Sequence, residues 1–160
     1  MTITVGDTLP DATFSTFGPD GPEPRDTNAV FAGRRVALFA VPGAFTPTCS
    51  ARHLPGFVEQ ADAIRAKGVD AIACTAVNDV FVMKAWGEAS GVGDSVLMLA
   101  DGNGDFARAI GMEADSSRFG MGTRSRRYAM IVDDCRVAWV SVEEPGGYGE
   151  SSADSLLKAL

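Results

Sequence analysis

The chain has 160 residues, 46% of them hydrophobic, and a formal net charge of −7. This length and hydrophobic content are typical of one globular domain, so we expect residues 1–160 to form a single domain. The negative charge argues against nucleic acid and anionic membrane surfaces as partners, because both are recognised through clustered positive charge. The mixed, polar start of the sequence, with no apolar run near the ~20 residues of a membrane-spanning helix, predicts a soluble, cytoplasmic protein.

The cysteine content excludes two further classes of protein. Cys49, Cys74 and Cys135 are too few and too widely spaced for a disulfide framework or for a zinc site, which needs four close ligands. We therefore expect a reducing compartment, at least one free thiol and no bound metal.

The first clear elements of secondary structure are a buried strand and a helix. Residues 36–41 form a continuous apolar run that Pro42-Gly43 closes, as is typical of a central strand covered on both faces. Residues 49–67 have helical composition. Pro55-Gly56 interrupts this segment and predicts a kink, and Gly68 is expected to end it.

The rest of the chain continues to alternate strands and helices. The expected segments are strand 69–77, a helix capped at residues 78–79, strand 96–100, a hairpin of strands 128–132 and 137–142, and a terminal helix opening at residues 151–154. The alternation predicts an α/β fold, and the late hairpin adds antiparallel strands to parallel ones. We therefore expect a mixed central sheet flanked by helices.

Cys49 stands at a position that activates a thiol. It follows a strand end and two prolines, and it lies at the expected start of a helix. Unpaired backbone N–H groups and the positive end of the helix dipole there stabilise a thiolate over a thiol. The thiolate is the nucleophilic form, so we expect Cys49 to be reactive.

A thiolate that attacks an O–O bond also needs hydrogen-bond donors along that bond. Thr46 is close enough in sequence to supply one. An arginine suits the second role because it stays cationic and offers several fixed donors, and Arg124, Arg126 and Arg127 lie together before a predicted strand.

The residues around Cys49 resemble a known family. Pro42, Thr46 and Cys49 match the P-x-x-x-T-x-x-C signature of peroxiredoxins. Residues 41–50 and 53–57 look like the peroxiredoxin-5, or type II, subfamily, including its bacterial glutathione-dependent members. The similarity continues through residues 73–79, 86–87, 99–102 and 126–130, so it covers nearly the whole chain.

The resemblance implies a thioredoxin-like fold and a set of roles. Cys49 is then the peroxidatic nucleophile, Thr46 and Arg127 complete its surroundings, and Pro42 shields the thiolate from water. Hydrogen peroxide and small organic hydroperoxides become water or alcohol while Cys49 becomes a sulfenic acid, without a bound cofactor or metal. The family often forms homodimers through loops near the active site, and we expect one here.

One departure from the family concerns the reductant. Many members carry a resolving cysteine just ahead of the terminal helix, but residues 148–152 contain none. This predicts an external thiol, and the resemblance suggests glutathione with glutaredoxin; thioredoxin is the alternative. A non-enzymatic redox sensor or relay would use the same activated thiol, so this function stays open.

Three other candidate residues are given structural interpretations. Cys74 lies in an apolar strand and is expected to be a packed, inert thiol. Cys135 follows two aspartates in a predicted turn and is expected to be an incidental exposed thiol, although an intermolecular disulfide remains open. His53, four residues after Cys49, shares its helix face, and is expected to pack near the site rather than act as a base.

Further residues are expected to play ordinary roles. Residues 101–105 resemble the first half of a calcium loop, but later ligand positions do not fit, so a turn and helix cap are expected. An apolar set is expected in the core. A basic set is expected at a solvated edge, although a role in attracting the carboxylates of glutathione stays open. The apolar set is Phe45, Phe81 and Trp86, and the basic set is Arg118, Arg124 and Arg126.

Overall fold

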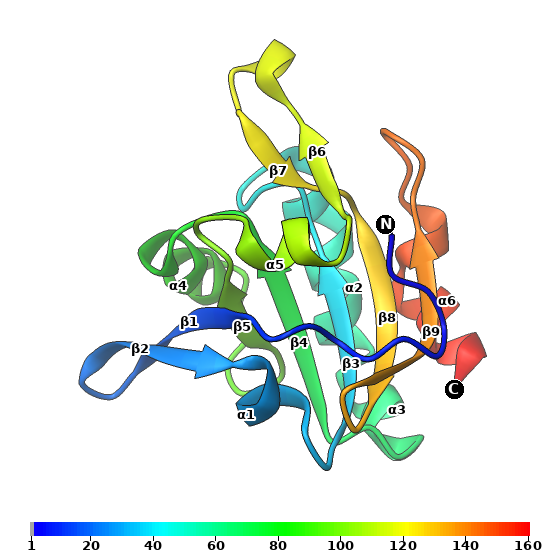
Figure 1. Cartoon of the computed structure of the whole chain (residues 1–160). Coiled ribbons are helices and arrows are strands. Elements are labelled where there is room, and N and C mark those ends of the chain that lie inside the picture. The colour runs from blue at the N-terminus through cyan, green and yellow to red at the C-terminus, as the bar shows by residue number, and fades with distance from the viewer. Residues whose placement is uncertain (1) are drawn as a thin grey trace.

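The computed structural model describes residues 2–160 and is built around one mixed sheet (Figure 1). Its seven strands run in the order β2-β1-β5-β4-β3-β8-β9. The strands are β1 (Thr13–Gly18), β2 (Gly21–Asp26), β3 (Arg35–Ala40), β4 (Ala71–Ala76), β5 (Leu97–Ala100), β8 (Tyr128–Asp133) and β9 (Arg136–Val142). The three central strands β3, β4 and β5 are parallel, and the flanking strands pair antiparallel, so the mixed sheet is confirmed.

Helices cover both faces of this sheet. They are α1 (Thr27–Phe31), the π-helix η1 (Cys49–His53), α2 (Leu54–Glu59), α3 (Ala61–Ala66), α4 (Val80–Ala89), α5 (Asp105–Ala109) and α6 (Ala153–Ala159). The short turns η2 (Ser117–Phe119) and η3 (Gly149–Ser151), and a small sheet of β6 (Glu113–Asp115) and β7 (Thr123–Ser125), complete the elements. The β6–β7 ribbon projects away from the large sheet (Figure 1).

Strand β3 explains why the core has two halves. Its side chains alternate between the faces of the sheet and are all buried after Arg35. Phe39 contacts the cluster that α2, α3, α4 and α6 cover, whereas Leu38 contacts the cluster beneath α1 and α5. The continuous apolar run of this strand is therefore the consequence of burial on both sides, as the sequence predicts.

Two local predictions are confirmed, the cap of the helix after β4 and the hairpin near the C-terminus. The Asp79 side chain accepts a hydrogen bond from Val82 N at 2.9 Å and caps α4. The β8–β9 hairpin turns at Asp134 and Cys135, both with positive φ (48° and 66°), which is the geometry of a tight two-residue hairpin. Among the described residues, no helix combines the length and apolarity needed to cross a membrane.

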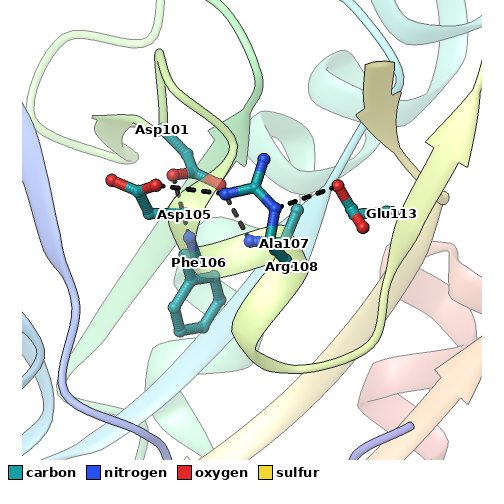
Figure 2. Close-up of polar contacts among 6 residues, drawn as sticks. All are labelled: Asp101, Asp105, Phe106, Ala107, Arg108 and Glu113. Atoms are coloured by element: carbon teal, nitrogen blue, oxygen red, sulfur yellow. Dashed lines mark hydrogen bonds and ion pairs between the residues drawn. The ribbon is translucent and has the colours of Figure 1, made fainter. Parts of the chain in front are cut away.

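The loop 101–105 is a helix cap, as expected (Figure 2). The buried carboxylate of Asp101 accepts hydrogen bonds from Phe106 N at 3.0 Å and Ala107 N at 2.9 Å, at the start of α5. Arg108 then pairs with Asp105 and with Glu113, each at 3.3 Å. Within residues 2–160, no cluster of His, Cys, Asp and Glu side chains is placed to hold a metal ion.

The expectation that three aromatic residues lie in the core is wrong for two of them. Trp86 is buried, but Phe45 is 54% exposed and Phe81 is 63% exposed. Phe45 lies in a loop at a φ of 64°, and Phe81 falls outside the buried stripe of α4, which contains Met83 and Trp86. Hydrophobicity alone did not reveal this orientation.

Candidate active site

The loop after β3 holds itself in a compact turn. Thr46 Oγ1 donates to Gly43 O at 2.7 Å, and Thr46 N donates to the same carbonyl at 3.4 Å. Ala44 N donates to Asn78 Oδ1 at 2.9 Å, which ties the loop to the segment after β4. Because β3 and β4 are parallel, their carboxyl ends meet at one edge of the sheet, and the loop lies there.

A widened helical turn carries Cys49 out of this loop. Helical backbone begins at Pro47, and the stretch from Cys49 to His53 is a π-helix in which Leu54 N donates to Cys49 O. Pro55 lacks an N–H, and its ring clashes with the carbonyl four residues earlier, which favours a wider turn just before it. The predicted irregularity therefore lies on the N-terminal side of Pro55, and a break at Gln60 then separates α2 from α3.

Cys49 and Arg127 are brought into direct contact. The Cys49 side chain is buried, and Arg127 Nη2 donates to Cys49 Sγ at 3.1 Å. Arg127 immediately precedes β8, which pairs with β3, so the register of the sheet places the guanidinium beside the sulfur. A permanent cation at this distance stabilises negative charge on the sulfur.

His53 holds the other half of the same guanidinium. Arg127 Nη1 lies 2.8 Å from His53 Nδ1, and His53 Nε2 lies 2.8 Å from Ser151 O. A guanidinium only donates, so Nδ1 accepts and Nε2 carries the proton that Ser151 O receives. Burial lowers the pKa of His53 to about 3, the Ser151 bond opposes this shift, and Arg127 adds to it. The imidazole is thus neutral at ordinary pH.

The sequence interpretation of His53 was incomplete. The residue does lie near Cys49, but it also bonds to the predicted arginine. The spacing of four residues between Cys49 and His53 indicates that they share a helix face. No sequence pattern indicates the contact of His53 with Ser151, which lies 98 residues further along the chain. Ser151 and its buried neighbour Glu143 were missed for the same reason.

The other predicted site residues occupy the surrounding loop. Pro42 is partly buried two residues after the end of β3. Thr46, three residues before Cys49, donates its hydroxyl proton to Gly43 O. Thr46 O also accepts from Ser50 N at 2.9 Å, which joins the loop to the π-helix. Trp86 Nε1 donates to Ser50 Oγ at 2.9 Å and fixes this helix against α4.

The expectation of a solvated basic edge is wrong for Arg124. Its Nη1 donates to Val77 O at 3.1 Å and its Nε donates to Met121 O at 2.9 Å. The Arg124 side chain therefore joins the segment after β4, through Val77 O, to the β6–β7 loop, through Met121 O. Arg118 is exposed and lies over the Phe119 ring, as an edge residue would.

The remaining cysteines occupy unreactive positions. Cys74 is fully buried in β4, and burial, followed by the nearby Cys49, raises its pKa well above the ordinary value. Cys135 lies in the hairpin turn, and burial, Asp134 and Asp11 raise its pKa. The interpretation of Cys74 as a packed thiol agrees with the structure, whereas Cys135, which was expected to be exposed, is half-buried against the core.

Fold and site together define a class of protein: a thioredoxin-like fold that holds a buried thiol beside an arginine. A family model described as Redoxin matches residues 4–157. Chloroplastic peroxiredoxin-2E-2 of Oryza sativa subsp. japonica is 57% identical over 164 residues, covering 99% of this chain and 73% of that protein. Peroxiredoxin-2B of Arabidopsis thaliana is 48% identical over 159 residues, covering 99% and 98%.

A solved structure agrees with these relatives. The crystal structure of reduced Prx3 in complex with hydrogen peroxide, from Vibrio vulnificus, matches with a TM-score of 0.95 and 51% identity, over 99% of each chain. The chain belongs to the peroxiredoxin family. It is a thiol peroxidase, and the family and fold predicted from its sequence are confirmed.

Proposed function

We propose that the chain reduces hydrogen peroxide and small organic hydroperoxides by direct attack of the Cys49 thiolate. The observation that carries this proposal is the 3.1 Å contact from Arg127 Nη2 to Cys49 Sγ. The sulfur bonds to one peroxide oxygen, the O–O bond breaks, and the leaving oxygen takes a proton to become water or an alcohol. Cys49 is left as a sulfenic acid.

The neighbours of Cys49 are assigned separate roles. Arg127 stabilises the thiolate and the charge that develops on the peroxide oxygens. Thr46 is the second polar group: its only hydroxyl proton is donated to Gly43 O, so its oxygen can accept a hydrogen bond from the peroxide O–H and orient the peroxide while the loop keeps its shape. Pro42 limits the access of water.

We propose that an external thiol, glutathione with glutaredoxin, returns Cys49 to its reduced state. No cysteine occurs after residue 135. Cys135 lies beyond the far end of β8 from Arg127, and a strand of six residues spans about 20 Å. Cys74 is buried with a raised pKa, so it is a weak nucleophile. Neither internal thiol is suited to resolve the sulfenic acid.

The resolving steps balance without a cofactor. One thiol attacks the sulfenic sulfur, releases water and forms a mixed disulfide with Cys49. A second thiol attacks that disulfide, restores the Cys49 thiol and leaves as an external disulfide.

Peroxide consumption with defined reductants tests this proposal. We expect many turnovers with glutathione and glutaredoxin and slower turnover with thioredoxin, and Cys49→Ser should be inactive with either. Faster turnover with thioredoxin would replace the proposed reductant. A single turnover with both would favour the alternative, a redox sensor or relay.

We also propose a homodimer in the cytoplasm. Phe45 projects from the active-site loop, and Phe81 and Phe17 form an exposed pair with ring centroids 5.9 Å apart. Exposed aromatic clusters often mark protein interfaces. All three cysteines are free, which suits a reducing compartment. Light scattering of the wild type and Phe45→Ser should give dimer and monomer masses, and a monomeric wild type would contradict the proposal.

A further inference from the structure

A buried carboxylate lies behind the active site and takes no part in the chemistry described above. Glu143 directly follows β9 and is only 5% exposed. Its Oε2 accepts hydrogen bonds from Ser151 N at 2.5 Å and from Ser151 Oγ at 2.7 Å. The ion pairs among residues 2–160 do not include Glu143. A carboxylate is costly to bury, so these two bonds are its main compensation.

The backbone and side chain of Glu143 lead to the same arginine by two routes. Glu143 N donates to Arg127 O at 2.9 Å, because β8 and β9 pair in register at this end. From its side chain, the bonds pass through Ser151 to His53 and then to the Arg127 guanidinium. The hydrogen bonds therefore form a closed ring that begins and ends at Arg127, with Cys49 attached to it.

Each member of the ring constrains the next. Two bonds from Ser151 to Glu143 fix where the Ser151 carbonyl points, and this carbonyl selects the His53 tautomer with a proton on Nε2. Only that tautomer leaves Nδ1 free to accept from Arg127. If the carbonyl moved, the imidazole could carry its proton on Nδ1, and the guanidinium would lose its second anchor.

We propose that Glu143 is a positioning residue, which acts through Ser151 and His53 to aim the Arg127 guanidinium at Cys49. This inference rests on the proposed role of Cys49 and Arg127 in peroxide reduction. A reacting geometry is sensitive to displacements of about 1 Å, and supporting hydrogen bonds of this kind preserve it. The C-terminal segment around Ser151 thereby contributes to the site without any side chain at the sulfur.

Three variants and two measurements test the proposal. Glu143→Ala removes the carboxylate. Glu143→Gln removes the charge but keeps one oxygen that can accept both hydrogen bonds from Ser151. Glu144→Ala is the matched control at an adjacent exposed position. Stopped-flow tryptophan fluorescence measures the rate at which peroxide oxidises Cys49. Nitrogen NMR of the imidazole reports the tautomer without assignment, because His53 is the only histidine.

We expect Glu143→Ala to slow the oxidation of Cys49 by about 10- to 100-fold and to lose the pure Nε2–H tautomer of His53. Glu143→Gln should fall between Glu143→Ala and the wild type in both measurements, and Glu144→Ala should match the wild type. If Glu143→Ala does not fold, the same two measurements on Glu143→Gln decide the matter.

Two results would overturn the proposal. One is a wild-type rate in the folded variants. The other is a slower rate with an unchanged His53 tautomer, which would make Glu143 a structural residue only. Cys49→Ser distinguishes a failure of this proposal from a failure of the proposed function. If Cys49→Ser still consumed peroxide, the proposed function itself would be wrong. If Cys49→Ser is inactive and the Glu143 variants give either of the two results above, only the positioning role of Glu143 is wrong.

Discussion

Arg127 contacts the sulfur of Cys49 with one terminal nitrogen, at 3.1 Å, and its other terminal nitrogen is already held by an imidazole. The guanidinium is thus fixed at two points in a buried site. A planar fork of donors with a permanent charge meets this requirement, and no other side chain offers both properties.

The first prediction concerns the shape of this cation. Arg127→Lys keeps the charge but cannot reach Cys49 and His53 together, so we expect the rate of Cys49 oxidation to fall by about 100-fold. Arg118→Lys, at an exposed position, is the control and should match the wild type. Stopped-flow kinetics with hydrogen peroxide measures both variants. A rate for Arg127→Lys within twofold of the wild type would show that charge alone suffices.

The second prediction concerns pH and stability. The pKa of His53 is lowered from 6.5 to about 3 on folding, so below pH 6.5 the unfolded chain binds a proton that the folded chain excludes. Stability should therefore fall as the pH drops from 6.5 towards 3, by up to about 1.4 kcal/mol per pH unit from this group. Above pH 6.5 the group makes no such contribution.

Urea unfolding at several pH values measures this dependence. Because the chain has one histidine, His53→Gln should be less stable at pH 7 but should lose about 1–2 kcal/mol less than the wild type between pH 6.5 and 5. Equal losses in the two proteins would contradict a buried, neutral imidazole.

The third prediction concerns the hairpin turn. Cys135 adopts a φ of 66°, which is unfavourable for a residue with a Cβ, and an Asp-Gly pair suits this turn best. We expect Cys135→Gly to raise the free energy of unfolding by about 0.5–1 kcal/mol and to leave peroxide turnover unchanged. A loss of turnover would instead give Cys135 a part in the catalytic cycle.

The fourth prediction concerns the buried cap of α5. Asp101→Ala leaves the N–H groups of Phe106 and Ala107 without their acceptor, so it should cost about 2–4 kcal/mol of stability. Asp105→Ala removes an exposed pair with Arg108 and should cost under about 1 kcal/mol. Adding calcium should not raise the melting temperature of the wild type, and a clear rise would revive the metal interpretation of this loop.

The predictable parts of the fold were those in which local sequence and tertiary environment agree. The apolar run of β3 reflects burial on both faces, and the position of Cys49 between a strand and a helix needed no distant partner. Strand β2 was missed because its sequence, with Pro22 and Pro24, lacks an apolar pattern. Prolines of this kind are tolerated at the edge of a sheet, which is where β2 lies.

The residues of the candidate site also fall into those that the sequence predicts and those that it does not. Cys49, Thr46 and Pro42 lie within eight residues of one another, so their proximity followed from sequence. Arg127 came from the family resemblance. Glu143 and Ser151 depend on the register of β8 with β9 and on the placement of η3, and no local pattern of residues encodes either.

The intact mass of the protein after one equivalent of hydrogen peroxide, without any added thiol, tests the resolution of Cys49 by an external thiol most directly. We predict a gain of one oxygen atom, located on Cys49 and trapped by a reagent specific for sulfenic acids. Cys49→Ser should gain nothing. A loss of two hydrogen atoms, with a disulfide from Cys49 to Cys74 or Cys135, would contradict resolution by an external thiol.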